Sequence, residues 1–365
     1  MYVETYIHEV IRSRSGFLFL KIALHALSVC YRLGVWFRHL AFNKKWIKQS
    51  RATIPVVSIG NIVAGGTGKT AFVKKVSEDL CSSGKIFILS RAYRSLVEKR
   101  RESLYLNAKS KVTPEICGDE VYMLLKSLQG VDFLIGRDRV MGMKQALQKG
   151  ADLIVLDDGM QYRRLYRDIE VVMLHADNLY GKGYFLPRGY LRDSPKRLEK
   201  ADFLVVHHIK EKTQFHNIQK EVAKYSQAPI IGTKMGSLYV LLSKGKKLHS
   251  LQGKRVGVFC GLGSPSSFIQ TTKEMGADVI KTMILPDHIA PSRKKLNMFS
   301  KLCKEKGCEL IICSEKDRVK LQPHTTLCLP IGELKAQLEV VMGQEIYSTL
   351  LSKIKDRMKS NETMD

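Results

Sequence analysis

The chain has 365 residues, which is long for one ordinary domain and about right for two. With 44% hydrophobic residues and no visible repeat or long low-complexity tract, it is not a repeat protein and can bury a sizeable core. Its 60 lysine and arginine residues against 35 aspartate and glutamate residues give a net charge of +25. This balance predicts an anionic partner, which is nucleic acid, an acidic membrane surface or a phosphorylated small molecule.

Residues 16–42 are the most apolar stretch of the chain. The preceding residues contain glutamates and no cleavage pattern, so a secretory signal peptide is not predicted. Charged and histidine side chains interrupt the stretch, which also argues against a clean transmembrane span. On a helix, the polar residues fall on one narrow stripe, and the other faces are apolar. The stripe consists of Arg14, Lys21, His25, Ser28, Arg32 and His39.

Aromatic and basic residues gather in the same segment. Trp36 and Trp46 are the two tryptophans of the chain, and residues 1–51 hold nine lysines and arginines against two glutamates. Such a mixture favours the membrane–water interface. We therefore expect residues 1–50 to form an amphipathic segment that lies on an anionic bilayer. The alternative is an ordinary helix that packs against the core of the protein.

The stretch SIGNIVAGGTGKTAF, residues 58–72, reads as a phosphate-binding loop. Gly68, Lys69 and Thr70 complete the pattern G-x-x-x-x-G-K-[ST], but Val63 stands where its first glycine is expected. An apolar run at 54–60 predicts a strand before the loop, and apolar residues at helical spacing follow it. A strand, a glycine-rich loop and a helix are the context that such a loop requires. A plain glycine-rich turn is the alternative.

In this interpretation, each residue near the end of the loop has a defined task. Backbone N–H groups would point at phosphate oxygens, and the start of the helix would add a favourable dipole. Lys69 would reach the β- and γ-phosphates of ATP, and the Thr70 hydroxyl would hold Mg²⁺. The residues expected to bind the nucleotide are Gly65, Gly66, Thr67, Gly68, Lys69 and Thr70.

Further strands are expected at 85–90, 131–136, 151–161, 169–175 and 201–208. The run at 151–161 ends in two carboxylates. Asp157 fits the acidic partner of Mg²⁺ in enzymes with this loop, and Asp158 and Gln161 are within reach of the same ion. The alternative is a strand end at which an aspartate caps the next turn.

Two other polar clusters are candidates for contact with a substrate. Asp119 and Glu120 stand just before a helical pattern, where they also suit a helix N-cap and its first turn. The basic segment YFLPRGYLRDSPKRL, residues 184–198, offers Arg188, Arg192 and two further cations to a phosphate group. These cations are equally compatible with simple solvation.

A second β/α alternation follows a polar stretch near 243–254. Strands are expected at 254–263, 277–285 and 308–317, and helices at 264–276 and 292–307. Ser266 replaces the third glycine of a dinucleotide motif, so no such site is expected here. His288, beside Asp287, is a candidate partner for a general base, or an exposed loop residue.

Eight cysteines are scattered along the chain without a C-x-x-C pair. Cys303, Cys308 and Cys313 are evenly spaced, but they match no zinc pattern. We expect buried free thiols in a reducing cytosol.

Taken together, seven motifs resemble those of the tetraacyldisaccharide 4'-kinases, the lipid A 4'-kinases of Gram-negative bacteria. They cover most of the chain in the family's order, behind an apolar and basic N-terminal segment of the kind that the family has. The family's loop also lacks its first glycine, so Val63 agrees with the resemblance. The motifs are SIGNIVAGGTGKT (58–70), SRAYR (90–94), GDE (118–120), LDDGMQ (156–161), LPRGYLRD (186–193), PDH (286–288) and SEKDRVKL (314–321).

The resemblance implies a kinase on the cytoplasmic face of the bacterial inner membrane. It would transfer the γ-phosphate of ATP, with Mg²⁺, to the 4'-hydroxyl of tetraacyldisaccharide 1-phosphate and so form lipid IVA. It also implies an α/β fold with two domains and a cleft between them, for which we expect residues 51–240, a P-loop kinase domain with a parallel sheet, and residues 241–365, a smaller α/β/α domain.

The resemblance also assigns roles to residues. By motif match, Asp119 would activate the sugar hydroxyl, and His288 would support it as a dyad. We expect six residues to lie near the substrate, namely Asn61, Arg91, Glu120, Arg188, Arg192 and Asp287.

The chain departs from the family pattern at several positions that concern contacts with sugar or lipid. Ala92 and Arg94 replace glycines. In the other motifs, unusual residues stand where the family has a small residue, proline, glutamate and histidine, and these are Arg188, Tyr190, Asp193 and Ile289, respectively.

Other functions are less well supported. A GTPase of the same fold usually carries D-x-x-G and N-K-x-D motifs, which this chain lacks. A membrane scaffold with a vestigial loop would not need an intact Lys69, Thr70 and Asp157. Nucleic acid is not an expected partner, because no motif interleaves aromatic and basic residues on a strand. We expect a monomer.

Overall fold

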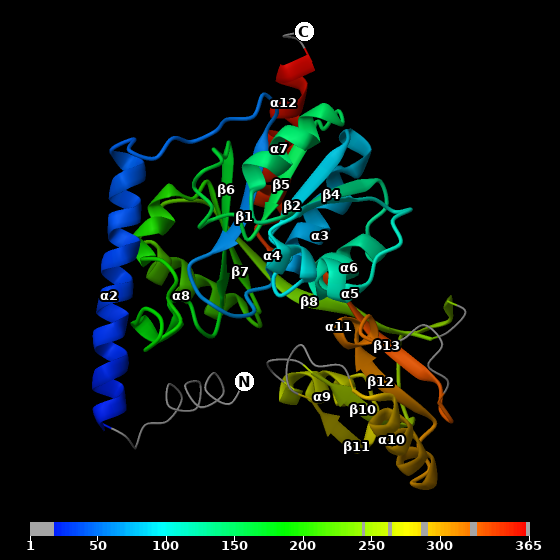
Figure 1. The fold of residues 1–365 in the computed structure, drawn as a ribbon. Helices are drawn as coiled ribbons and strands as arrows, with labels where there is room; N and C mark the ends of the chain where they lie inside the picture. The colour runs from blue at the N-terminus through cyan, green and yellow to red at the C-terminus, as the bar shows by residue number, and fades with distance from the viewer. Residues whose placement is uncertain (1–17, 243–244, 262–264, 286–290, 322–326, 363–365) are drawn as a thin grey trace.

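The computed structural model describes residues 18–242, 245–261, 265–285, 291–321 and 327–362. One 13-stranded sheet runs through the molecule (Figure 1). In spatial order it contains β11 (Asp278–Ile284), β10 (Arg255–Cys260), β12 (Leu310–Ser314), β13 (Ile331–Met342), β8 (Ile230–Leu241), β7 (Phe203–His207), β6 (Ile169–His175), β1 (Val56–Asn61), β5 (Leu153–Asp157), β2 (Ile86–Ser90), β4 (Val131–Gly136) and β3 (Ser103–Leu106), with β9 (Lys247–Leu248) paired to β8.

Helices cover both faces of this sheet, and the N-terminal helix stands to one side of it (Figure 1). They are α2 (Leu18–Asn43), α3 (Lys69–Leu80), α4 (Leu96–Arg100), α5 (Pro114–Cys117), α6 (Asp119–Ser127), α7 (Arg139–Gln148), α8 (Lys212–Val222), α9 (Pro265–Glu274), α10 (Arg293–Glu305), α11 (Glu315–Arg318) and α12 (Gln344–Glu362), with short 3-10 turns at Cys81–Ser83, Gly181–Gly183 and Pro195–Lys200.

The strands expected from apolar runs are confirmed. In the first half of the sheet, neighbouring strands pair in parallel, in the spatial order β8, β7, β6, β1, β5, β2 and β4. Their side chains alternate between two cores. Ile86 and Ile88 of β2 pack on the side of α3, whereas Phe87 and Leu89 pack on the side of α7. A strand buried on both faces reads as a continuous apolar run, which is why periodicity located these strands.

A long antiparallel pair joins the two halves of the sheet. β8 pairs with β13 along most of their length, and β13 also pairs in parallel with β12. In Figure 1, β8 and β13 lead from the upper part of the molecule, which contains β1 to β7, to the lower part, which contains β10 to β12. Neither β8 nor β13 was expected from the sequence, because they combine apolar and charged residues without a clean alternation.

The last helix returns to the first half of the chain. Tyr347, Leu350, Ile354 and Met358 of α12 are buried in the same core as α3. The range 241–365, expected for a second domain, therefore contains a helix that packs on the P-loop half, and the division of the chain near residue 240 stays a proposal.

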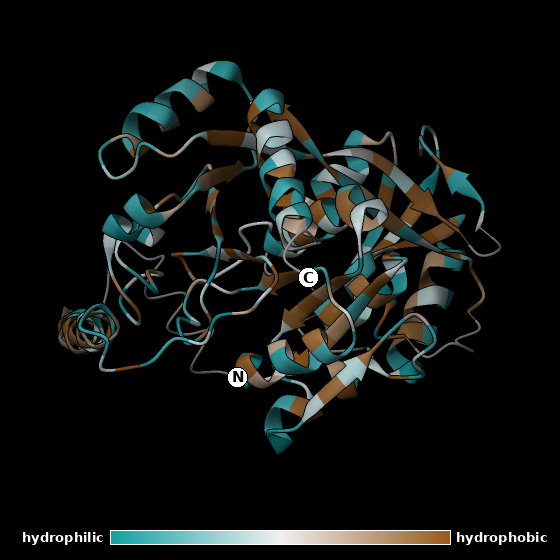
Figure 2. Ribbon diagram, turned by 90° about the horizontal axis from the view of Figure 1, so that it is seen from above, coloured by the Kyte–Doolittle hydropathy of each residue, from teal (hydrophilic) through white to brown (hydrophobic). Residues whose placement is uncertain are grey.

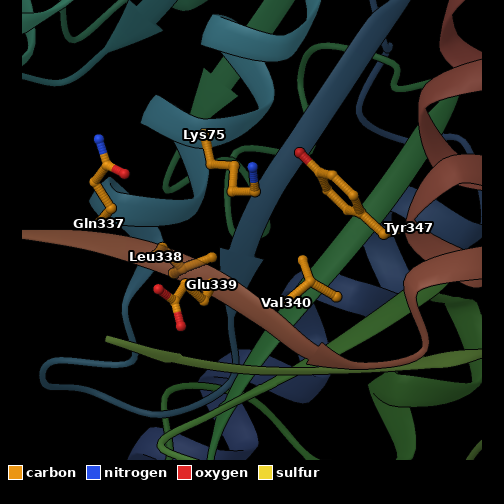
Figure 3. A pocket seen from close by; sticks show the side chains of 6 residues that line it. All are labelled: Lys75, Gln337, Leu338, Glu339, Val340 and Tyr347. Carbon is orange, nitrogen blue, oxygen red and sulfur yellow. The ribbon is translucent and has the colours of Figure 1, made fainter. Parts of the chain in front are cut away.

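A hollow of about 400 Å³ lies between α3, β13 and α12. In Figure 3 the side chains of Lys75 and Tyr347 face this space from opposite sides. The Lys75 ammonium lies 5.4 Å from the centre of the Tyr347 ring. None of the predicted site residues within the described ranges lines this hollow.

The N-terminal helix α2 has apolar side chains both on its buried side and on its exposed side. Leu24, Ser28, Val35 and Phe42 are its buried residues, and most of its other side chains are exposed or half-buried. Figure 2 views α2 nearly end-on at the left margin, with one side next to the rest of the molecule. Among the described residues, Phe19–Asn43 is the one helical stretch long and apolar enough to cross a membrane, by length and composition alone.

Polar groups attach α2 to the rest of the protein. The Ser28 hydroxyl donates to the backbone carbonyl of Phe185 at 2.9 Å. His39 Nε2 lies 2.8 Å from a carboxylate oxygen of Asp193, which is fully buried. The predicted polar stripe thus faces inward at Ser28 and His39. The large apolar side chains that remain exposed on this helix are Phe19, Ile22, Leu27, Leu33, Trp36 and Phe37.

The eight cysteines are free, as expected, but not all are buried. Cys303, Cys308 and Cys313 lie together in one apolar core, whereas Cys30, Cys81 and Cys328 are exposed. In the described part of the chain, no group of histidine, cysteine and carboxylate side chains is arranged to hold a metal by itself.

Candidate functional site

The glycine-rich loop connects β1 to α3, as the sequence predicts. Gly65 has a φ of +118° and Gly68 a φ of +80°, so both occupy backbone conformations that favour glycine. Val63, by contrast, is buried and forms an antiparallel bridge with Leu191. Val63, which stands at the position of the missing glycine, thus lies before the phosphate-binding part of the loop, where the chain is attached to the rest of the protein. The bend itself depends on Gly65 and Gly68.

Asn61 is the hub of a hydrogen-bond network behind the loop. Its side-chain Nδ2 donates to the Thr67 hydroxyl at 2.8 Å, and both residues are buried. Gln161 Nε2 donates to the backbone carbonyl of Asn61 at 2.8 Å, and Arg192 Nη1 donates to its side-chain oxygen at 3.3 Å. The Thr67 hydroxyl therefore already has a hydrogen-bond partner within the protein. The group of Thr67 that suits a phosphate oxygen is its backbone N–H.

Asp158 binds two cations. Lys69 Nζ lies 3.7 Å from one of its carboxylate oxygens, and Arg192 Nη1 donates to both oxygens at 3.1 and 3.0 Å. Burial acts to raise the pKa of Asp158, but Lys69, Arg192 and Arg139 outweigh it and lower the pKa. Asp158 is therefore ionised at neutral pH.

Asp157 has the opposite electrostatic environment, although it is the neighbouring residue. Its carboxylate is buried and accepts a hydrogen bond from the Ser90 hydroxyl at 3.0 Å. Burial, together with the negative charges of Glu120 and Asp158, raises the pKa of Asp157 to about 6. Lys69 and Arg139 oppose this shift without cancelling it. A cation next to Asp157 would therefore be favourable.

The donor set fits Mg²⁺, which prefers carboxylate and hydroxyl oxygens and completes its shell with water and phosphate. The Thr70 hydroxyl lies 3.5 Å from a carboxylate oxygen of Glu120, which in turn lowers the acidity of Asp157. The side-chain oxygen of Gln161 is buried without a hydrogen-bond partner in the described structure. These oxygens would need water and phosphate beside them, because no cluster of three protein carboxylates is formed in the described ranges.

Asp119 is the first residue of α6 and is half-buried. The N-cap position belongs to Gly118, and no side chain caps this helix. The capping interpretation of Asp119 is therefore wrong, although a carboxylate in the first turn still gains from the helix dipole. Gly118 itself has a φ of +85° and packs against the backbone of Ala92 and Tyr93.

The segment SRAYR forms the turn on which Gly118 rests. Ala92 and Arg94, which stand where the resembling family has glycines, have φ values of +54° and +62°. The departure from glycine thus leaves the left-handed backbone in place. Glu98 holds the turn, since its carboxylate accepts hydrogen bonds from Arg91 Nε and from the Arg94 backbone N–H. The Arg91 side chain is 54% exposed.

The remaining substrate candidates are only partly brought together. Arg192 reaches the Asp158 carboxylate, whereas the Arg188 guanidinium stacks on the Tyr184 ring at 3.7 Å. Tyr184 also contacts His25 of α2, so Arg188 lies beside the N-terminal helix. Asp287 and His288 fall outside the described residues.

Three further residues touch the site and were not expected from the sequence. Ser90 binds Asp157, and the buried Arg139 donates to the backbone carbonyl of Asp158 at 3.2 Å. His207, at the end of β7, lies against Gly68 of the loop. Ser90 and His207 are polar residues at the ends of apolar runs, and this pattern could have marked them in the sequence as candidate site residues. Arg139 is the first residue of a helix, and no such pattern distinguishes it in the sequence.

The comparisons with known proteins agree with this geometry. The family model described as tetraacyldisaccharide-1-P 4'-kinase matches residues 20–355. A tetraacyldisaccharide 4'-kinase of Syntrophus aciditrophicus is 32% identical over 94% of this chain and 95% of its own length, and one of Chlamydia abortus is 35% identical over 88% of both.

A solved structure extends the likeness to the whole fold. The crystal structure of LpxK from Aquifex aeolicus in complex with ATP has a TM-score of 0.73 and 28% sequence identity to this chain. The match covers 92% of this chain and 99% of that one. The chain therefore belongs to the tetraacyldisaccharide 4'-kinase family, and it is an ATP-binding kinase.

Proposed function

We propose that this kinase transfers the γ-phosphate of ATP to the 4'-hydroxyl of tetraacyldisaccharide 1-phosphate, which gives lipid IVA in lipid A biosynthesis. One observation carries the proposal. The phosphate-binding loop, the Asp157–Asp158 pair and the start of α6 converge, with Lys69 on Asp158 and Thr70 beside Glu120. Nucleotide-binding groups and a candidate base thus meet in one place.

The loop would hold the phosphates of ATP. The N–H groups of residues 65–70 and the start of α3 suit the phosphate oxygens, and Lys69 adds a positive charge. Mg²⁺ would be held by Thr70 and Asp157, with Asp158 and Gln161 adjacent, and when bound it neutralises charge on the phosphates. Arg192 orients Asp158 by a hydrogen bond. Arg192 also bonds to Asn61, which in turn donates to Thr67 of the loop.

Asp119 is our candidate for the base that receives the proton of the sugar hydroxyl. A sugar hydroxyl is a very weak acid, so a carboxylate that accepts its proton during transfer favours the reaction. Asp119 is half-buried at the start of α6, one residue before Glu120, which faces Thr70. His288 and Asp287 remain candidates for its support.

We further propose that α2 lies on the cytoplasmic face of the bacterial inner membrane. Its anchoring groups, Ser28 and His39, contact the protein, while Trp36 and Phe37 are more than half exposed. An exposed apolar face with basic residues beside it suits an anionic bilayer surface. A lipid substrate would be presented at the same surface.

A phosphate-transfer assay tests the function. Purified protein in detergent receives labelled ATP, Mg²⁺ and tetraacyldisaccharide 1-phosphate, with Asp119→Ala in parallel. We expect labelled bisphosphorylated lipid from the wild type and about 10²-fold to 10⁴-fold less from the variant, with ATP affinity nearly unchanged. ATP consumption without labelled lipid would instead indicate another acceptor. Full activity of the variant would remove Asp119 from the mechanism.

A further inference from the structure

The ring of His207 lies directly against Gly68 of the phosphate-binding loop. A Cβ atom placed on Gly68 would come within 2.6 Å of His207 Cδ2 and 2.8 Å of its Cγ. The ring and the glycine backbone are therefore in close contact on the side where any other residue would carry its side chain. Gly68 is also the N-cap of α3, and its φ of +80° sets the direction in which the helix begins.

The protein holds this ring firmly. His207 is the last residue of β7 and is 3% exposed. Its Nδ1 is 3.1 Å from the hydroxyl of Thr233, a fully buried residue of β8. The Thr233 hydroxyl is also 3.4 Å from the Val206 carbonyl. Two neighbouring strands thus fix both the place and the rotation of the ring.

The ring is also uncharged near neutral pH. Burial, with the neighbouring rings of His208 and His175, lowers the pKa of His207 to about 3. The His208 ring centre is 4.3 Å from that of His207, and the His175 ring contacts His208 at 4.6 Å. His207 therefore presents a flat neutral surface rather than a second cation beside Lys69.

The loop is held on both sides of Gly65 and Gly66. A Cβ placed on either glycine would find no atom within 4 Å, so neither packs against a neighbour on that side, and the Ala64 N–H before them donates to the Tyr190 carbonyl at 2.7 Å. The hydrogen bond from Asn61 to Thr67 fixes the loop on one side of Gly68. The Gly68 carbonyl accepts a hydrogen bond from the Phe72 N–H of α3 at 3.0 Å, and the His207 ring is the side-chain group that limits where the Gly68 backbone lies.

We propose that His207 is a positioning residue for the phosphate-binding loop, whose ring is the surface against which Gly68 packs and which thereby places the backbone N–H and side chain of Lys69. The inference rests on the proposed use of this loop for ATP. His207 does not touch the reacting atoms in this arrangement, and it acts through Gly68. Its effect should therefore appear in nucleotide affinity.

The experiment measures the affinity of the full-length protein for MgATP by calorimetry, without the lipid. We expect His207→Ala to weaken binding about tenfold, because the loop loses its support. His207→Phe keeps a flat ring and should stay within about threefold of the wild type. His216→Ala, which alters an exposed histidine of α8, is the matched control and should leave the affinity unchanged.

Kinetics separate positioning from general damage. In the kinase assay, we expect the KM for ATP to rise in His207→Ala, while kcat and the KM for the lipid change little. If His207→Ala does not fold, His207→Asn decides the question, because Asn can keep the bond to Thr233 but lacks the ring beside Gly68. Weakened MgATP binding by the folded Asn variant supports the proposal.

Two results would overturn it. Wild-type affinity for MgATP in folded His207→Ala or His207→Asn would show that the ring does not position the loop, and would leave the proposed function intact. Failure of the wild-type protein itself to bind MgATP would instead remove the proposed function, and this inference with it.

Discussion

Helix α3 has two contrasting surroundings. Along its flank it meets α12 in an apolar core that contains Phe72, Tyr347 and Leu350, and the Tyr347 hydroxyl donates to Asp79 at 2.6 Å. At its first turn it meets the carboxylates of Asp157 and Asp158, of which Asp157 is buried and has a raised pKa. The flank is mostly apolar, whereas the first turn holds charge that the fold alone does not neutralise. Stability and chemistry are therefore located at different parts of one helix.

This comparison predicts that stability and activity can be lost separately. Removal of the Lys69 charge should produce the largest effect, and it should be confined to activity. We expect Lys69→Ala to lower kcat/KM for ATP by at least about 10²-fold. The unfolding free energy, measured by denaturant titration, should change by less than about 1 kcal/mol, because Asp158 keeps Arg192 as its partner.

Lys74→Ala is the matched control for that experiment. Lys74 lies one turn further along α3 and pairs with Glu78 at 3.9 Å on the surface. Lys74→Ala should change neither activity nor stability appreciably. Loss of stability in Lys69→Ala equal to its loss of activity would break the comparison.

The apolar flank should show the reverse behaviour. Leu350 of α12 is fully buried, so Leu350→Ala should reduce the unfolding free energy by about 2–5 kcal/mol, as measured by denaturant titration. Activity per folded molecule should stay unchanged. Leu33→Ala on α2, where the leucine is 49% exposed, is the control and should cost less than about 0.5 kcal/mol.

The buried carboxylate should make stability fall with rising pH. The pKa of Asp157 is raised from 3.8 to about 6, so the folded protein binds its proton more tightly than the unfolded chain does. This contribution is present in acid and is lost as the pH rises from about 4 to about 6. We expect Asp157→Asn to be more stable than the wild type at pH 7, by about 3 kcal/mol, and nearly equal to it at pH 4.

Asp158→Asn should give the opposite sign. Because the pKa of Asp158 is lowered, its ionised form stabilises the folded protein, and this stability is lost as the pH falls through that pKa. Thermal unfolding curves of both variants and the wild type from pH 2 to pH 8 check the pair, because the loss for Asp158 occurs below its ordinary pKa of 3.8. Parallel pH profiles for the two variants would contradict the assigned environments.

The N-terminal helix extends the comparison, because several of its large apolar side chains, among them Trp36 and Phe37, face away from the protein. We expect Trp36→Ser combined with Phe37→Ser to reduce binding to anionic lipid vesicles by about tenfold or more, since both side chains would leave the bilayer surface. Co-sedimentation with vesicles measures this. Met141→Ser, at an exposed methionine on α7, should bind as the wild type does. Equal binding by all three proteins would argue against α2 as the membrane surface.

The smallest expected effect concerns the turn beside Gly118. Arg94 has a left-handed backbone, which costs most residues about 1–2 kcal/mol but costs glycine little. Arg94→Gly should therefore be more stable than Arg94→Ala by about 0.5–1 kcal/mol, after the greater freedom of glycine in the unfolded chain is counted. Denaturant titration of the two variants measures their unfolding free energies. Because both variants lack the arginine side chain, the difference reports the backbone conformation.

Local patterns in the sequence determined the strands β1, β2 and β4 to β7, the glycine loop and the start of α3. Their information is carried by neighbouring residues, as apolar runs, helical spacing and the G-K-T sequence. The same patterns pointed to Asp157, Asp158 and Gln161, because polar residues after a buried strand stand out. The inward use of the polar stripe on α2 could not be read from periodicity, which gives a face but not its partner.

Tertiary structure alone decided what these residues meet. The antiparallel pairing of β8 with β13 and the return of α12 to α3 depend on contacts between distant segments. The different pKa values of Asp157 and Asp158 arise in the same way, because burial and the cations around them come from β2, α7 and the segment near Arg192. A local pattern does not encode such distances, so the support of Gly68 by His207 became visible only in the fold.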